Sequence, residues 1–189
     1  MTLLPTIPAG LVLTPGASAD RDHSTLVAID DALADIPVLR LTLGTTSVPR
    51  AVTKIVEATT EFAESLDADL SSLVIGGRSF GGRACSVAAA EGLAVGGLML
   101  LSYPLHPPGK PDKLRVDHFP ELTMPTWFIS GEKDPFGTPA EFEQHIAAIP
   151  GNTTLEWVGG GHSPKKAQEQ EVVEKVRRAL QLDDVDRYA

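Results

Sequence analysis

The sequence predicts an α/β fold in which helices cover both faces of a mostly parallel sheet of about six strands. Short apolar runs, each the length of a buried strand, alternate at least five times with segments of helical spacing. No internal repeat and no linker-like composition interrupts this alternation. Parallel neighbours need helical crossovers, so the pattern indicates a three-layer domain whose chemistry lies at the carboxyl ends of the strands.

The first half of the chain contains three strand–helix units. An apolar run closed by Pro-Gly predicts a strand at residues 10–14, and apolar residues at helical spacing predict a helix at 24–36. A strand at 37–43 follows, and Pro49 suits the start of a helix at 49–66. The apolar run at 71–77 predicts the next strand, and small residues at 80–91 predict a helix that packs closely on it.

The second half repeats the pattern around a proline-rich loop. Apolar runs predict strands at 94–105, 124–131 and 152–160. Helical spacing predicts helices at 138–149 and 165–182, the last of them amphipathic.

Composition narrows the classes of function. The 189 residues suit one domain, 1–189, and the net charge of −9 argues against nucleic acid or an anionic membrane surface as a partner. The single cysteine, Cys85, excludes an internal disulfide and fits a cytoplasmic protein. No apolar run reaches the roughly 18 residues of a spanning helix. The N-terminal apolar run lacks a preceding basic residue and contains prolines, so we do not expect a signal peptide.

A Gly-x-Ser-x-Gly motif, Gly77 to Gly81, lies between the strand at 71–77 and the helix that follows. In this position a strained turn can raise the oxygen of Ser79 above the sheet, where it would act as a nucleophile. Gly77 and Gly81 are then required because a Cβ would clash with neighbouring backbone. The glycines match neither a dinucleotide fingerprint nor a phosphate-binding loop. The alternative is a tight turn whose serine only caps the helix beginning at Phe80.

A serine nucleophile needs an imidazole to accept its proton. His162 follows the last strand on a glycine loop, which places it at the carboxyl edge beside the serine turn. We therefore predict His162 as the base. The other histidines after the serine lie on a helix or beside the proline-rich loop: His106, His118 and His145.

The imidazole in turn needs a carboxylate to orient it. Asp134 follows the strand at 124–131, and Pro135 and Gly137 make a turn that would direct it back over the sheet. We predict Asp134 as the acid, with Glu132 as the alternative. The oxyanion of the reaction would be held by the backbone N–H groups of Phe80 and of Ala17, although Pro15-Gly16 could equally form an ordinary turn.

With these residues in the order Ser, Asp, His, the sequence resembles a small α/β-hydrolase of the dienelactone-hydrolase-like branch. The motifs that carry the resemblance are GGRSFGG, SYPLHPPGKP and GEKDPFG, and it covers nearly the whole chain. It implies a hydrolase sheet that lacks the first two strands and any cap domain, with Ser79, Asp134 and His162 as the triad. Relatives usually have His-Gly where this chain has Pro15-Gly16.

We expect a serine hydrolase that acts on carboxylic esters or thioesters of small to medium acyl groups through an acyl-enzyme. Candidate pocket residues are Arg78, which could reach an anionic group or bind a structural carboxylate, and Leu105 and Phe136, which could also be core. No metal-binding spacing is present, and the mechanism needs no cofactor. The alternatives are a carbon–carbon hydrolase with the same triad and a non-catalytic interaction protein. The oligomeric state stays open.

Overall fold

The computed structural model describes residues 7–34 and 36–182 and contains one six-stranded sheet. The strands are β1 (Gly10–Thr14), β2 (Val38–Arg40), β3 (Leu73–Arg78), β4 (Gly97–Leu101), β5 (Thr126–Gly131) and β6 (Thr153–Val158). Their order across the sheet is β2-β1-β3-β4-β5-β6, and every neighbouring pair is parallel. All six strands therefore present their carboxyl ends at one edge, which confirms the expected fold class.

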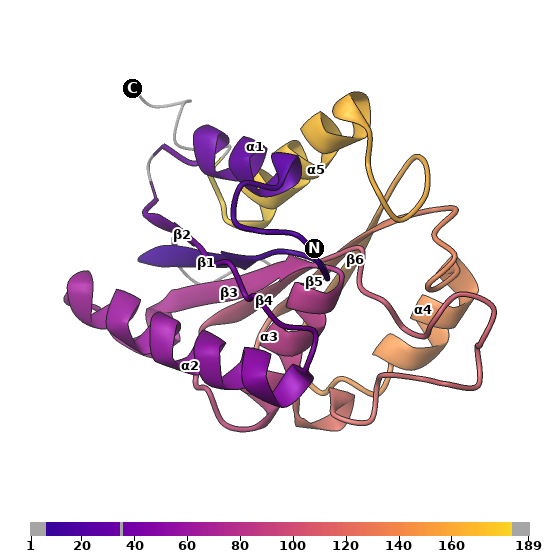
Figure 1. The fold of residues 1–189 in the computed structure, drawn as a ribbon, viewed down its shortest axis with the longest axis horizontal. Helices are drawn as coiled ribbons and strands as arrows, with labels where there is room; N and C mark the ends of the chain where they lie inside the picture. The colour runs from indigo at the N-terminus through magenta and orange to yellow at the C-terminus, as the bar shows by residue number, and fades with distance from the viewer. Residues whose placement is uncertain (1–6, 35, 183–189) are drawn as a thin grey trace.

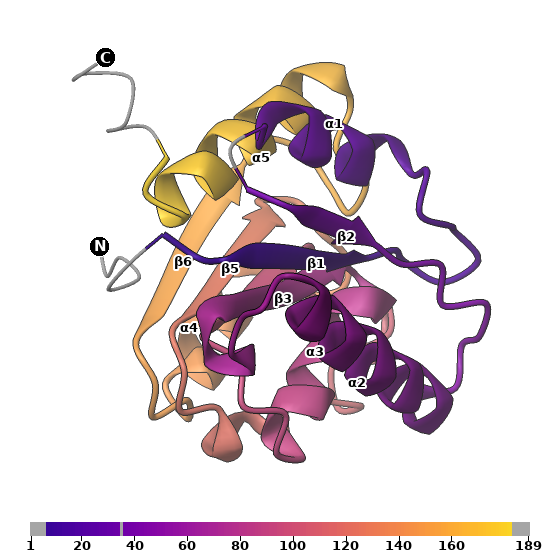
Figure 2. The same ribbon diagram turned by 90° about the vertical axis from the view of Figure 1, so that its left-hand side faces the viewer.

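Helices cover both faces of this sheet (Figures 1 and 2). The helices are α1 (Ser24–Ala32), α2 (Val48–Ser65), α3 (Phe80–Ala90), α4 (Pro139–Ile146) and α5 (Lys166–Ala179), with short 3₁₀ turns η1 (Leu70–Ser72) and η2 (Phe119–Glu121). α1 and α5 pack together on one face, and α2, α3 and α4 lie on the other. The layers are therefore helix, sheet and helix.

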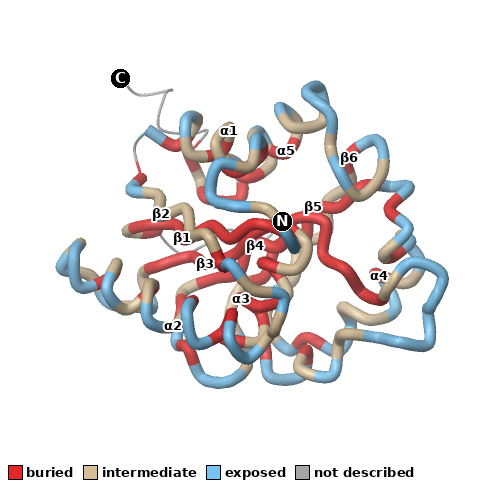
Figure 3. The backbone as a smooth tube through the Cα atoms, viewed as in Figure 1, coloured by how far each residue is buried: buried red, intermediate tan, exposed pale blue. Residues whose placement is uncertain are grey.

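Two apolar clusters hold the layers together, one on each face of the sheet. Alternate residues of one strand belong to different clusters: Leu11 and Leu13 of β1 face α1 and α5, whereas Val12 faces α2 and α3. The strands β1, β3, β4 and β5 are buried throughout, as Figure 3 shows in red. Strands buried on both faces read as continuous apolar runs, which explains why the sequence pattern located them.

Most elements are shorter than the sequence predicted; the strand expected at 94–105, for example, covers only Gly97–Leu101. The helix expected at 24–36 ends at Ala32, because Leu33 leaves helical geometry and its N–H bonds to Asp30 in a closing turn. Leu33 and Ile36 are still buried, so their apolar spacing persists beyond the helix, and residue 35 lies outside the described residues. The strand expected at 37–43 pairs over only three residues, Val38–Arg40, with β1 as its single neighbour.

Candidate active site

The connection between β3 and α3 is a sharp turn centred on Ser79. Ser79 has φ 51° and ψ −117°, a backbone conformation that costs a non-glycine residue strain and is typical of functional turns. A Cβ on Gly77 would lie 2.1 Å from the Thr14 carbonyl oxygen, and one on Gly81 2.4 Å from that of Pro15. The expected need for glycine at both positions is thus confirmed.

The Ser79 hydroxyl faces the imidazole of His162. Ser79 Oγ lies 2.8 Å from His162 Nε2, and His162 Nδ1 lies 2.8 Å from Asp134 Oδ2. A carboxylate only accepts hydrogen bonds, so Nδ1 must carry the proton and Nε2 is left to accept the serine proton. Ser79 makes no side-chain bond to the N-terminus of α3, and the capping role considered for it is therefore wrong.

Burial and packing hold the carboxylate and the imidazole in place. The Asp134 side chain is fully buried, and its second oxygen, Oδ1, accepts the Phe136 N–H at 2.9 Å. The Phe136 ring stacks on His162, with 4.1 Å between the ring centroids and 29° between the planes. The carboxylate and the imidazole thus each have a second partner that restricts their movement.

The residues weighed as alternatives lie elsewhere. Glu132, two residues before Asp134, is exposed and its N–H bonds to Val158. His118 bonds to Ser86 of α3 at 2.8 Å, and His106 Nε2 lies 3.3 Å from Glu141. That His106–Glu141 approach is close enough for an ion pair but lacks hydrogen-bond geometry. Among the described histidines, only His162 makes a hydrogen bond to Ser79.

Arg78, the residue before the serine, joins the serine turn to the histidine loop. It is 8% exposed, and its Nη2 donates to the His162 carbonyl oxygen at 2.8 Å and to Ser163 Oγ at 2.6 Å. Burial lowers the pKa of the guanidinium, and the carboxylates of Asp134 and Glu169 oppose that shift. Its direct partners are a carbonyl and a hydroxyl.

Of the two predicted oxyanion donors, Phe80 directly follows Ser79, and Ala17 belongs to the loop after β1. A Cβ on Gly16 would lie 3.6 Å from Ser79 Cβ and 3.3 Å from Arg78 Nη1, so the loop after β1 passes directly over the serine turn. The Ala19 N–H closes a turn on the Gly16 carbonyl. Within residues 7–34 and 36–182, the N–H groups of Ala17 and Phe80 have no acceptor. Two amides near Ser79 are therefore available to a ligand.

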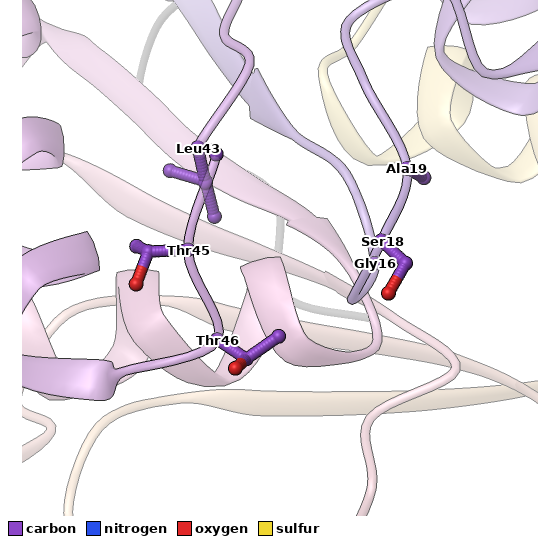
Figure 4. A pocket seen from close by; sticks show the side chains of 7 residues that line it. Gly16, Ser18, Ala19, Leu43, Thr45 and Thr46 are labelled. Carbon is purple, nitrogen blue, oxygen red and sulfur yellow. The ribbon is translucent and has the colours of Figure 1, made fainter.

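A cavity of about 420 Å³ opens beside Gly16, between the loops after β1 and β2 (Figure 4). One wall is formed by Gly16, Ser18 and Ala19, and the other by residues 43–46. None of the predicted pocket residues lines it. Leu105 is fully buried in the core, so it faces no open pocket, and Phe136 covers His162 instead.

The sequence did not identify the residues that line this cavity, because they belong to loops without a recognisable motif: Ser18, Leu43, Thr45 and Thr46. Their position after β1 and β2, at the carboxyl edge, is the one signal in the sequence that could have identified them.

Comparisons with known proteins agree with this architecture. The family model for the alpha/beta hydrolase domain matches residues 8–184. The chain belongs to this family. Its fold is similar to a dienelactone hydrolase from Anabaena variabilis, with a TM-score of 0.77 and 20% identity, covering 94% of this chain and 88% of that one. A thermophilic esterase from Thermogutta terrifontis gives a TM-score of 0.74 and 17% identity, covering 93% and 90% of the two chains.

A carboxylesterase from Bacillus cereus gives a TM-score of 0.65 and 16% identity, covering 95% of this chain and 92% of that one. At these identities the likeness concerns the fold. The six strands of this hydrolase correspond to a hydrolase sheet without its first two strands, and the described residues include no cap over the carboxyl edge.

The described part of this hydrolase holds no group of three or more His, Cys, Asp or Glu side chains placed to bind a metal ion. None of its described helices is both long and apolar enough to cross a membrane. Cys85 is completely buried below the serine turn, and burial raises the pKa of its thiol to about 12. A thiol in that state is a poor nucleophile, so Ser79 is the better nucleophile candidate.

Proposed function

We propose that this hydrolase cleaves carboxylic esters or thioesters through an acyl-enzyme formed on Ser79. The observation that carries the proposal is the continuous hydrogen-bonded series from Ser79 Oγ through His162 to the buried Asp134. Nucleophile, base and orienting carboxylate need this geometry, and each step spans 2.8 Å. The alpha/beta hydrolase family supports a hydrolytic reaction.

In the first half-reaction His162 Nε2 takes the proton from Ser79 Oγ as this oxygen attacks the carbonyl carbon of the substrate. The developing negative oxygen would be held by the free N–H groups of Ala17 and Phe80. Asp134 stabilises the imidazolium that forms, and its second hydrogen bond to Phe136 keeps the carboxylate aligned.

Acylation is completed when His162 gives this proton to the leaving oxygen or sulfur atom, and the acyl group stays on Ser79. A water molecule, deprotonated by His162, then attacks the acyl carbon. The bond to Ser79 Oγ breaks, the acid leaves, and His162 returns the proton to Ser79 Oγ. The substrate is a small molecule, and this mechanism requires no cofactor.

A fluorophosphonate probe and a p-nitrophenyl acetate assay test the proposal together. Native protein should be labelled and should hydrolyse the ester, whereas Ser79→Ala should lose labelling and at least about 10⁴-fold in rate. The matched control is Ser71→Ala, because Ser71 is an exposed residue of η1 at the opposite end of β3. Hydrolysis by Ser79→Ala at the native rate, or a native protein that neither reacts with the probe nor cleaves esters, would overturn the proposal.

The non-catalytic alternative has less support. Ile7 and Leu114 are the only large hydrophobic residues of the described chain that are exposed, so its surface offers little apolar area for a protein partner. A carbon–carbon hydrolase with the same triad has no feature of this site that favours it. We place the activity in one domain, with the reducing cytoplasm as the compartment that a single buried cysteine suits.

A further inference from the structure

We propose that the cavity between the loops after β1 and β2 holds the acyl group of the substrate and selects short, uncharged acyl groups that carry an additional oxygen atom. Hydroxyacyl and alkoxyacyl esters are the class meant. The inference rests on the proposed serine hydrolase function and names the substrate class of the same site.

The position of the cavity assigns it to the acyl group rather than to the leaving group. His162 follows β6 and must protonate the leaving atom, so the leaving group lies toward the β6 side of Ser79. The cavity lies beyond Gly16 on the other side of the serine, where β1 and β2 end. With the carbonyl oxygen on the Ala17 and Phe80 amides, the remaining substituent of the carbonyl carbon points into this cavity.

The lining determines which acyl groups fit. No Asp, Glu, His, Lys or Arg lines the cavity, and Arg78 behind Gly16 is buried and bonded to the histidine loop. A charged acyl group would therefore lose hydration without a direct counter-ion. Leu43 is the one larger apolar side chain. Ser18 and Thr46 are exposed residues of the cavity wall, and their hydroxyl groups have no partner among the described residues, so a ligand oxygen would replace only water there. Thr45 Oγ1 accepts the Ser47 N–H and is therefore already engaged. Two free hydroxyls favour an acyl group with an oxygen atom of its own.

The volume of the cavity limits the length of the acyl group, and hydrogen bonds hold its two walls together. The Arg21 N–H donates to Thr42 Oγ1 at 3.0 Å, and Arg40 Nη1 donates to the Arg21 carbonyl oxygen at 2.6 Å. These contacts join the loop after β1 to the end of β2 and to the loop that follows it. The volume of about 420 Å³ lies near the lower end for ligand pockets, which suits a short group rather than a long alkyl chain.

The test compares p-nitrophenyl esters of 3-hydroxybutyrate, butyrate and acetate in native protein, Thr46→Val and Thr46→Trp. Thr46→Val removes a hydroxyl at nearly constant shape, so kcat/KM for hydroxybutyrate relative to butyrate should fall about fivefold, the effect of one neutral hydrogen bond. Thr46→Trp fills the cavity, so kcat/KM for butyrate relative to acetate should fall more than about tenfold. Thr53→Val, which removes an exposed hydroxyl on α2, is the matched control and should change neither ratio.

The outcomes separate the two proposals. If native protein cleaves acetate but both ratios are unchanged in the Thr46 variants, the cavity does not hold the acyl group and this inference fails alone. A series of acetate esters with larger alcohols provides a second check: loss of activity in Thr46→Trp that grows with the alcohol would place the leaving group in the cavity and overturn the assignment. If native protein cleaves none of these esters and is not labelled, the proposed function fails and the inference fails with it.

Discussion

Replacing Arg78 by methionine tests whether this buried arginine positions the base. Arg78 touches neither the Ser79 hydroxyl nor the imidazole, but it holds the carbonyl of His162 and the hydroxyl of Ser163 through one nitrogen. Methionine keeps the apolar part of the side chain and removes both donors. The histidine loop then loses its hydrogen bonds to the serine turn.

The structure sets the size of the effect. A hydrogen bond to a charged group contributes about 1.5–3 kcal/mol, but the two acceptors lie near the surface and can bond to water after the change. We therefore expect a loss of about 2 kcal/mol in the free energy of unfolding. The activity should fall further: a displacement of the imidazole by about 1 Å is enough to lower kcat about 10²-fold.

The assay is steady-state hydrolysis of p-nitrophenyl acetate together with the rate of fluorophosphonate labelling. Arg78→Met should lower kcat and the labelling rate about 10²-fold with little change in KM, because the substrate contacts remain. Ser163→Ala removes one of the two bonds and should cost less than about fivefold. Arg78→Lys should fall between the two, since an ammonium cannot reproduce the planar arrangement of the guanidinium donors.

Two results would refute this reasoning. A kcat for Arg78→Met within threefold of native would mean that the histidine loop holds its position unaided. A rise in KM confined to esters with an anionic acyl group, with neutral esters unaffected, would show that Arg78 binds substrate, the other role that its position in the sequence allowed.

Three further changes test separate features. Asp134→Asn should lower kcat by roughly 10⁴-fold, because the wrong imidazole tautomer is then favoured, and Glu132→Gln should stay within about twofold; the reverse order in a kinetic assay would assign the acid to Glu132. Gly77→Ala should lower the free energy of unfolding by more than about 4 kcal/mol in chemical denaturation, because the new Cβ would lie 2.1 Å from a backbone oxygen. Gly92→Ala is the control: Gly92 has φ 109° but open space around it, so the loss should be about 1 kcal/mol. Equal losses for the two variants would exclude the steric cause. Burial and a nearby arginine lower the pKa of His118 to about 4, whereas the pKa in the unfolded chain is about 6.5. Folding therefore favours the neutral imidazole, and the protein loses stability as the pH falls from about 6.5 toward 4. His118 is partly exposed, so we expect it to contribute about 2 kcal/mol. The change in unfolding free energy between pH 7.5 and pH 4.5 should therefore be smaller in His118→Asn than in the native protein, and an equal change in both would contradict this.

Local patterns in the sequence determined the fold class. Strands buried on both faces must be apolar throughout, and helices that cover them must be amphipathic. The sequence therefore shows β3 as a continuous apolar run and α2 as apolar residues at helical spacing. The glycines around Ser79 are also local, because close backbone approach excludes any Cβ there. The ends of elements were less predictable: α1 stops at Ala32 although the apolar spacing continues, since a turn can bury Leu33 and Ile36 equally well.

The sequence order also singled out Ser79, Asp134 and His162 as candidates, but only the tertiary structure decided which groups meet. The contact between Asp134 and His162 spans 28 residues, and that between His162 and Ser79 spans 83. Residues so far apart come together through the order of the strands in the sheet, on which a local pattern carries no information. The same cause explains why Arg78 binds the histidine loop and why the cavity is lined by Ser18 and Thr46 rather than by Leu105.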